Sequence, residues 1–495
     1  MNGSRNPWWQ DGSMATEEPT AETNPALAAW ESVLAYAPRY LEHLRSFDRQ
    51  PGYQVAVAVD GTVIGTIAGG YADVAAGTEM TDAHQFRIAS HSKMFTATAI
   101  LQLVEAGSLT LEDAVADHLP ELAGTETGKV TVGELLSHSS GLTRDGTDSD
   151  FWVLSRPFPG RGVLLETAAN GRVIGRHTHF KYTNIGYGLL GLIIEAASGQ
   201  DYRGYVREKL IDPLALHDTG PDLDEGATKL ATGYGALAVM GEPYTLEHRC
   251  TIDHVDTGAL SAATGFYSTA GDVVRFLTAH LPQRPGQQAA GSPVSEHSKR
   301  RMQRALEQSG VPGRDYGLGM ILQEVHGQET FGHSGGYPGH ISRSWALPKT
   351  GVALSVLTNA IDGPATTWGE QLIGLASLAA AEIPSSYADV PVEQLNRFTG
   401  RFAGLWGVQD IVELGGKLYC LSLGASPDPA LTEPLEYVDA RTLRTRDPNG
   451  FGGYGEDFVF EFDAAGAVAI RGPGGMKLVR QTDFRVPSRV VNPAS

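Results

Sequence analysis

The sequence predicts an α+β fold in which one sheet is assembled from distant parts of the chain, followed by a small all-β domain. Strand-like runs occur near residues 53–68 and again near residues 341–357, and two helical stretches lie between them. Because strands at both ends of this region are separated by helices, which can cover the apolar face of a sheet, we expect the strands to share one sheet. The chain has 495 residues, more than one ordinary core fills, so a second domain is expected.

The predicted strands are short runs rich in β-forming residues. They cover Tyr53–Val59, Val63–Ala68, Ile341–Leu347 and Val352–Leu357. Asp60-Gly61 separates the first two runs and is a strong hairpin signal. The first two strands are therefore expected to pair antiparallel.

Two helices are predicted between these strands. Met94–Ala106 has apolar residues at helical spacing and is followed by Gly107, a helix stop. Ile185–Ser198 has the pattern of a buried helix and is ended by Gly199. Helices of this kind are expected to pack beside the sheet.

Composition divides the chain into segments. Residues 1–25 are polar and acidic and are predicted to be a flexible tail, before a main domain at 26–380. Residues 381–393 are small, polar and proline-containing, which predicts a linker. Residues 394–486 alternate short β-like runs with turns and predict a small barrel or sandwich, and residues 487–495 a second tail.

The charge balance excludes several classes of partner. Acidic residues outnumber basic ones 57 to 38, for a net charge of −19, so neither nucleic acid nor an anionic membrane is expected to bind. The chain has no apolar run long enough to span a bilayer and no secretory signal at its start, so a cytoplasmic location is expected. Cys250 and Cys420 are the only cysteines and lack metal-site spacing, so neither a disulfide framework nor a metal site is predicted.

A Ser-x-x-Lys motif, Ser90 to Lys93, lies immediately before the first predicted helix and occurs once in the chain. One helical turn separates the two residues, so their side chains can share a face. A lysine that loses its proton in a partly desolvated site can activate a serine hydroxyl. Taken alone, the motif is equally typical of an ordinary helix start with a solvated lysine.

A second motif, Tyr182-Thr183-Asn184, lies immediately before the second predicted helix. A tyrosine there can act in proton transfer, provided that a nearby cation helps it to ionise. Asn184 has both a donor and an acceptor with which to hold Lys93 and a substrate amide. The alternative is a buried, hydrogen-bonded tyrosine and a helix-capping asparagine.

A third motif, Gly332-His333-Ser334-Gly335-Gly336, is a glycine-rich segment that a substrate can approach closely. It also matches the G-x-S-x-G nucleophile elbow, but no helix follows it and no acid precedes the later histidine, so that interpretation fails. Gly186–Gly191 matches the dinucleotide motif G-x-G-x-x-G, but it lies inside a helical pattern, where small residues permit close packing.

These three motifs, in this order, resemble the serine β-lactamase and penicillin-binding-protein superfamily, in particular its class C-like branch of esterases and D-aminopeptidases. Flanking segments over about residues 30–380 are also similar: VTVGELLSHSSGL from Val130, ATGFYSTAGDVVRF from Ala263 and GHSGGYPGH from Gly332. The resemblance implies a β-lactamase-like antiparallel sheet flanked by helices, an all-α subdomain and a lipocalin-like C-terminal barrel. It implies no metal and no organic cofactor.

The resemblance also implies roles for individual residues. Ser90 would be the nucleophile, Lys93 and Tyr182 the proton-transfer pair, and Asn184 an orienting residue. The backbone N–H groups of Ser90 and Gly336 would form the oxyanion hole, and Gly335 would let the substrate lie along a strand edge.

His333 departs from the family pattern, because class C enzymes carry a lysine at this position of the site. A histidine is mostly neutral at pH 7, so recognition of an anionic β-lactam is expected to weaken at this point. We therefore predict a serine acyl hydrolase for a small-molecule or peptide acyl substrate, and favour a carboxylesterase. The alternatives are a D-amino-acid peptidase or amidase, a weak β-lactamase, a peptide-releasing or cyclising thioesterase, and a penicillin-binding sensor without turnover.

Four other features have simpler interpretations. His138 is expected to be a hydrogen-bonded structural histidine, and the acidic turn at Asp253–Asp256 a polar surface turn rather than a metal site. The aromatic segment 148–161 either lines an acyl pocket or packs over the core. The glycine-rich loop 447–457 either restricts the active-site mouth or is an ordinary hairpin turn of the second domain.

Overall fold

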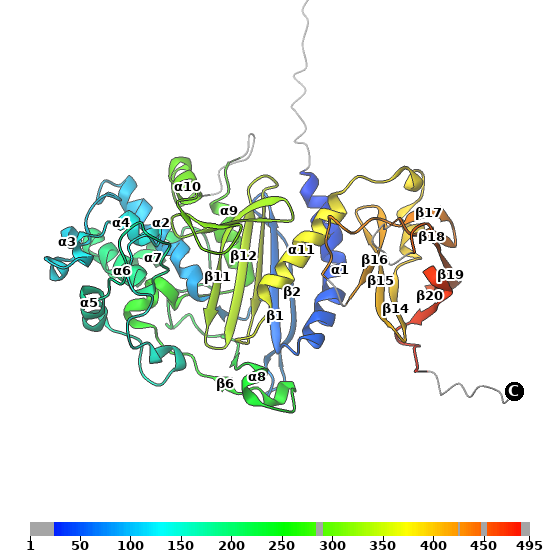
Figure 1. The fold of residues 1–495 in the computed structure, drawn as a ribbon, viewed down its shortest axis with the longest axis horizontal. Coiled ribbons are helices and arrows are strands. Elements are labelled where there is room, and N and C mark those ends of the chain that lie inside the picture. Colours follow the sequence, from blue (N-terminus) through cyan, green and yellow to red (C-terminus); the bar gives the residue numbers. More distant parts are fainter. Residues whose placement is uncertain (1–23, 284–290, 424–425, 447–452, 487–495) are drawn as a thin grey trace, which may run out of the picture.

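The computed structural model describes residues 24–283, 291–423, 426–446 and 453–486. Its main domain is built on an antiparallel sheet that joins both ends of that domain, as predicted (Figure 1). The sheet has nine strands, in the order β3 (Thr78–Glu79), β2 (Thr62–Asp73), β1 (Gly52–Val59), β13 (Val352–Thr358), β12 (His340–Leu347), β11 (Gln328–Tyr337), β10 (Ile321–Val325), β9 (Arg314–Tyr316) and β8 (Glu307–Gln308).

The centre of the sheet is formed by β1 and β13, which pair from Tyr53↔Thr358 to Val59↔Val352. Both strands are buried along their whole length, because helices cover the two faces of the sheet. The predicted hairpin between β1 and β2 is present, and Asp60 and Gly61 both have positive φ, at 49° and 87°. The α+β prediction is confirmed.

The two faces of the sheet are covered by different helices. The helices α1 (Pro25–Phe47) and α11 (Ala365–Ala380) pack on one face, against each other and the strands, and α9 (Ala270–Ala279) packs on the other. Helix α1 is not among the predicted helices, although its buried residues recur at helical spacing from Ala29 to Leu44. Asn24 caps this helix and Pro25 begins it, so the predicted tail is two residues too long; residues 1–23 lie outside the described part.

A helical subdomain lies beside the sheet, on the side away from the barrel (Figure 1). Its centre is the pair α2 (Ser92–Glu105) and α6 (Asn184–Ser198), which contact each other and match the two predicted helices. Around them lie α3 (Val115–His118), α4 (Val132–Leu136), α5 (Arg161–Ala169) and α7 (Tyr202–Val206). The dinucleotide-like glycines serve packing: a Cβ on Gly191 would lie 2.8 Å from the Cβ of Ala262.

Short elements connect these layers. The two-residue strands β4 (Phe86–Arg87) and β7 (Tyr267–Ser268) pair with each other, as do β5 (Gly233–Tyr234) and β6 (Thr251–Ile252). The helices α8 (Leu237–Met240) and α10 (Glu296–Met302) lie in connecting segments. Among the described residues, no helix is long and apolar enough to cross a membrane.

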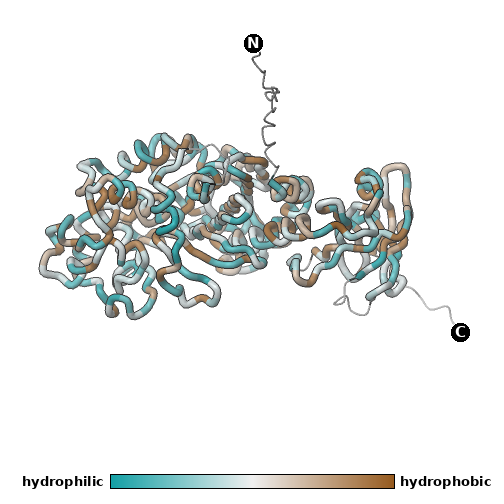
Figure 2. The backbone as a smooth tube through the Cα atoms, turned by 90° about the horizontal axis from the view of Figure 1, so that it is seen from above, coloured by the Kyte–Doolittle hydropathy of each residue, from teal (hydrophilic) through white to brown (hydrophobic). Residues whose placement is uncertain are grey.

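The C-terminal domain is an eight-stranded antiparallel sheet curled into a nearly closed barrel, a separate lobe in Figure 2. Its order is β16 (Lys417–Ser422), β15 (Gly407–Leu414), β14 (Gly400–Gly404), β21 (Lys477–Arg480), β20 (Gly466–Arg471), β19 (Asp457–Asp463), β18 (Thr442–Arg444) and β17 (Glu436–Asp439). The backbone N–H of Leu435 donates to the carbonyl of Leu418 at 2.8 Å, which brings the two edge strands together.

The segment predicted as a linker, 381–393, is packed on this barrel. It contains a short turn of helix at Ser385–Tyr387 and the start of α12 (Val392–Asn396). Tyr387 is buried in the barrel core, and its hydroxyl donates to the carbonyl of Leu435. The predicted tail 487–495 and most of the predicted gating loop, 447–452, lie outside the described residues.

Candidate active site

Ser90 lies on a single helical turn, Ala89–His91, that leads directly into α2. Ala89, the residue before it, has φ of +48°, a conformation that residues other than glycine rarely adopt. Strand β11 packs tightly against this turn, since a Cβ on Gly335 would lie 2.1 Å from the carbonyl oxygen of Ile88. Glycine at position 335 thus allows the strand to approach the turn that carries the serine, whereas the motif was interpreted as letting a substrate approach.

Lys93 is fully buried one helical turn after the serine. Its Nζ lies 3.2 Å from Ser90 Oγ, 2.8 Å from Asn184 Oδ1 and 2.8 Å from the carbonyl oxygen of Ala263. Burial lowers the pKa of this amine well below its usual value, opposed by the Asp145 charge. A neutral amine donates its two hydrogens to Asn184 and Ala263, which leaves its lone pair toward the serine hydroxyl.

Tyr182 contacts the serine from the other side, with its hydroxyl 2.8 Å from Ser90 Oγ. Burial raises the pKa of its phenol above the usual value, although the hydrogen bond to Ser90 and the Arg144 charge oppose this shift. The ring lies 4.7 Å from Lys93 Nζ. Tyr182 therefore keeps its proton at neutral pH, and Lys93 is the group able to accept one.

Asn184, the first residue of α6, connects the lysine to a pair of charged residues. Its Nδ2 donates to Asp145 Oδ1 at 2.7 Å, and the other oxygen of Asp145 lies 3.1 Å from Arg144 Nε. Arg144 and Asp145 are not among the site residues predicted from the sequence. The only signal was their position directly after the family-like segment that ends at Leu142.

His138 lies behind Tyr182 as a structural residue. Its Nδ1 accepts from the Thr183 N–H at 3.1 Å, and its carbonyl oxygen accepts from the Lys181 N–H at 2.9 Å. The imidazole and phenol rings have centroids 4.3 Å apart. His138 thus holds the backbone on both sides of Tyr182, and burial keeps the imidazole neutral by lowering its pKa.

His333 is buried on β11 and is neutral. Its Nδ1 donates to the Ser334 carbonyl oxygen at 2.6 Å, and its Nε2 accepts from the Tyr316 hydroxyl at 3.0 Å. Burial is the main cause that lowers its pKa well below the usual value, and the Lys93 charge acts in the same direction. The structure therefore places a neutral ring where the family pattern has a lysine.

Strand β10 pairs with β11 only as far as Gly332, so the edge of β11 beyond Gly332 has no hydrogen bonds to β10. The register of β10 ends at Ile321↔Gly332, whereas β12 pairs with β11 as far as Tyr337↔His340. Gly336 on this segment is exposed, and a Cβ there would meet only the Ile341 side chain, at 3.5 Å. An extended acyl substrate can align along such an edge.

Comparisons with known proteins agree with this geometry. The model of the family described as Beta-lactamase matches residues 39–370, which is most of the chain. The chain belongs to the β-lactamase family. Penicillin-binding protein 4 of Amycolatopsis lactamdurans is 30% identical over 363 residues, 70% of this chain and 90% of that protein.

Solved structures share the fold of this β-lactamase-family chain. The octameric penicillin-binding protein homologue from Pyrococcus abyssi is 23% identical, with a TM-score of 0.61 over 90% of this chain and 99% of that one. The D-amino acid amidase from Ochrobactrum anthropi SV3, complexed with L-phenylalanine amide, is 22% identical, with a TM-score of 0.59 over 71% and 99%. Both the resemblance and the prediction of a serine hydrolase are confirmed.

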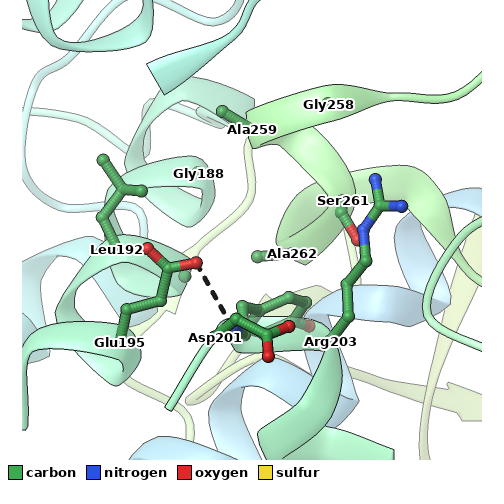
Figure 3. A pocket seen from close by; sticks show the side chains of 11 residues that line it. Gly188, Leu192, Glu195, Asp201, Arg203, Gly258, Ala259, Ser261 and Ala262 are labelled. Atoms are coloured by element: carbon green, nitrogen blue, oxygen red, sulfur yellow. Dashed lines mark hydrogen bonds between the residues drawn. The ribbon is translucent and has the colours of Figure 1, made fainter. Parts of the chain in front are cut away.

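A cavity of about 120 Å³ lies between α6, α7 and residues 258–262 (Figure 3). Its polar side chains already have partners in the chain: Glu195 accepts from the Tyr202 N–H, and Arg203 binds Asp222 and Asp256. The cavity contains none of the predicted site residues. We assign no chemistry to it.

The aromatic segment 148–161 packs over the core of the helical subdomain. Phe151 and Phe158 are buried, with ring centroids 4.9 Å apart, and Trp152 lies against both. In the acidic turn, Asp256 pairs with Arg203, and His254 is hydrogen-bonded to the Ala231 carbonyl oxygen. These contacts favour the structural interpretation of both segments.

Proposed function

We propose that this chain hydrolyses carboxylic esters through an acyl-enzyme on Ser90. Lys93 Nζ takes the serine proton while Oγ attacks the substrate carbonyl carbon, giving a tetrahedral oxyanion. The backbone N–H groups of Ser90 and Gly336 stabilise that oxyanion. The C–O bond to the leaving group breaks, and the departing alkoxide receives a proton from Tyr182, which recovers one from Lys93.

The second half of the cycle repeats these steps with water. Water attacks the ester carbonyl as Lys93 accepts its proton, and the Ser90 oxygen leaves with a proton from Tyr182 or Lys93. The single observation that carries this proposal is the position of Ser90 Oγ, in hydrogen-bond contact with both Lys93 and Tyr182. The pKa shifts of the two groups, in opposite directions, support a base and a proton donor.

Preference for esters is supported by the neutral His333. A β-lactam carboxylate gains most from a permanent cation near the site, and the ring at position 333 is buried and uncharged. Esters without a carboxylate need no cation at position 333. The alcohol of an ester is also a better leaving group than the amine of an amide. D-amino-acid amides are the alternative substrates that the amidase fold suggests.

The proposal is tested by steady-state kinetics on purified protein with 4-nitrophenyl acetate, D-phenylalanine amide and nitrocefin. We expect kcat/KM to be highest for the ester. Ser90→Ala should abolish turnover and labelling by a fluorophosphonate, while circular dichroism shows that the variant is folded. Turnover of the amide above that of the ester would replace the esterase proposal by an amidase.

A second candidate is a penicillin-binding protein that is acylated and does not turn over. The 30% identity with a protein named penicillin-binding protein 4 favours it. A fluorescent penicillin would then label Ser90 stoichiometrically, and ester hydrolysis would stop after one equivalent. Steady ester turnover beyond the first equivalent excludes this candidate.

A further inference from the structure

Arg144 is held beside the reacting groups by its backbone. Its carbonyl oxygen accepts hydrogen bonds from the N–H groups of Asn184, at 2.8 Å, and Ile185, at 3.2 Å, so it sits on the N-terminus of α6. The guanidinium carbon lies 5.7 Å from the centroid of the Tyr182 ring, whose hydroxyl contacts Ser90. The side chain is 66% exposed, so a molecule bound at Ser90 can reach it.

The guanidinium is oriented by one of its nitrogens only. Nε lies 3.1 Å from Asp145 Oδ2, and the side chain of Asp145 is only 10% exposed because Asn184 holds its other oxygen. Among the described residues, none forms a hydrogen bond with Nη1 or Nη2 of Arg144. The edge formed by Nη1 and Nη2 is the arrangement that binds a carboxylate through two parallel hydrogen bonds.

The buried lysine and histidines around Ser90 do not supply a permanent positive charge. Lys93 is buried, with its lone pair toward the serine, and the rings of His138 and His333 are buried with neutral hydrogen-bonding patterns. His91, on the same turn as Ser90, is also buried and bonds to the Ile88 carbonyl oxygen and to Ser344. Arg144 is thus an exposed cation beside Tyr182.

We propose that Arg144 determines substrate specificity by binding a carboxylate on the ester, through its Nη1 and Nη2 atoms. The inference rests on the proposed function, because it names the class of ester that would acylate Ser90. It places the recognising cation on the α6 side of Ser90, near Tyr182, rather than at position 333 on β11. The preferred substrates are then esters that carry a carboxylate near the scissile bond.

Two matched substrate pairs test this proposal. The first is 3-acetoxybenzoate and its methyl ester, which differ by a carboxylate on the leaving group. The second is the 4-nitrophenyl monoester of adipic acid and its methyl ester, which differ by a carboxylate on the acyl group. We expect the native protein to prefer the acid in at least one pair, with the preference decreasing as salt is added.

Arg144→Gln should remove this preference. A bidentate hydrogen bond to a charged group contributes roughly 10- to 100-fold, so kcat/KM for the preferred acid should fall by about that factor, through KM. The methyl ester should change by less than about two-fold, and Arg144→Lys should retain part of the preference. Arg161→Gln, which changes another partly exposed, carboxylate-paired arginine, is the matched control.

Three results would overturn the proposal: no preference for the acid in either pair, a preference that survives in Arg144→Gln, or equal loss on acid and methyl ester. Equal loss would mean that Arg144 only supports Asp145 and Asn184. Failure of the proposed function is recognised separately, because Ser90 would then not react with a fluorophosphonate. Dissociation constants of 3-carboxyphenylboronic acid and phenylboronic acid give the same comparison without turnover.

Discussion

At the residue scale, the chemistry depends on how far burial changes two ordinary side chains. The Lys93 side chain is fully buried, so the neutral amine is favoured and becomes a base. Tyr182 is shifted in the other direction and keeps its proton. The same loss of water therefore prepares an acceptor and a donor on two sides of one serine oxygen.

The pH dependence of ester hydrolysis follows from this arrangement. The active form has Lys93 neutral, so kcat/KM should fall as the pH drops through the lysine pKa, which burial places well below the usual 10.5. His138 and His333 remain neutral because burial lowers their pKa, so replacing His138 should not remove this acidic limb. Lys93→Ala should lower kcat at least ~100-fold and abolish the limb, as measured from pH 4 to 10. A limb that persists in Lys93→Ala would show that another group is the base.

Several site residues could be predicted from the sequence, and others could not. Ser90 and Lys93 are one turn apart, so their contact is local and visible in the spacing. Arg144 and Asp145 reach the site through hydrogen bonds to the start of α6, about 40 residues later in the chain. Nothing in their own surroundings indicates this contact, because it depends on the tertiary fold.

At the element scale, predictability follows local signals. The β1–β2 hairpin and the end of α6 could be predicted because a glycine marks each of them, at Gly61 and Gly199. In the structure both glycines have positive φ, at 87° and 73°, which glycine adopts without strain. In contrast, α1 contains Pro38, which normally interrupts a helix, and it is stabilised by packing against α11 and the sheet. The short strands β8 and β9 have two and three residues, too few for a sequence pattern.

The contact between β11 and the turn that carries Ser90 can be tested with two neighbouring glycines. A Cβ at Gly335 would lie 2.1 Å from the Ile88 carbonyl oxygen and 2.4 Å from Ser342 Oγ, so one of the two elements must move. We expect Gly335→Ala to lower the free energy of unfolding by about 1–3 kcal/mol. Its kcat/KM should fall at least ~10-fold, because a shift of the reacting groups by even 1 Å is costly.

Gly336→Ala is the matched control for stability alone, since its Cβ would be in ordinary contact with Ile341 at 3.5 Å, whereas its N–H is assigned to the oxyanion hole. Its stability should stay within about 0.5 kcal/mol of the native protein. Chemical denaturation and ester kinetics measure both effects. Native stability and activity in Gly335→Ala would show that β11 does not hold the serine turn in place.

At the scale of the whole molecule, the barrel and the main domain share part of one core. Residues of β15 and β16, among them Val412, Leu414 and Tyr419, pack into the same apolar cluster as α1, α11 and the outer face of the sheet. Lys417 donates to the carbonyl oxygens of Ala379 and Ala381 at the end of α11, where the helix dipole favours a cation. The barrel lies on the opposite side of α1 and α11 from the helical subdomain (Figure 1).

This arrangement limits what the barrel can do. The described part of the candidate gating loop, residues 453–457, belongs to the barrel, where Asp457 pairs with Arg444 and Glu456 accepts from the Gly474 N–H. Among the described residues, no barrel side chain forms a hydrogen bond with Ser90, Lys93 or Tyr182. The contacts of the described barrel residues favour a role in stability.

Asp410 on β15 is the residue with which to test that role, because it is fully buried between the barrel and α1. It accepts two hydrogen bonds from Arg401, at 2.8 and 2.9 Å, and one from the Tyr36 hydroxyl at 2.7 Å. Asp410→Ala leaves Arg401 without its partner, and breaking such a buried pair costs about 3–5 kcal/mol. Asp463→Ala, which breaks an exposed pair with Arg480, should cost less than about 1 kcal/mol.

Calorimetry and kinetics then distinguish a supporting barrel from a catalytic one. Because the two domains share a core, the native protein should unfold in one transition, and Asp410→Ala should unfold at a lower temperature or in two steps. Its kcat/KM for 4-nitrophenyl acetate at 25 °C should stay within about two-fold of the native value, because β15, which carries Asp410, lies on the other side of α1 from the helical subdomain with α2 and α6 (Figure 1). A large loss of activity in a variant that is still folded at that temperature would show that the barrel takes part in the reaction. Unchanged unfolding would show instead that Asp410 does not join the domains.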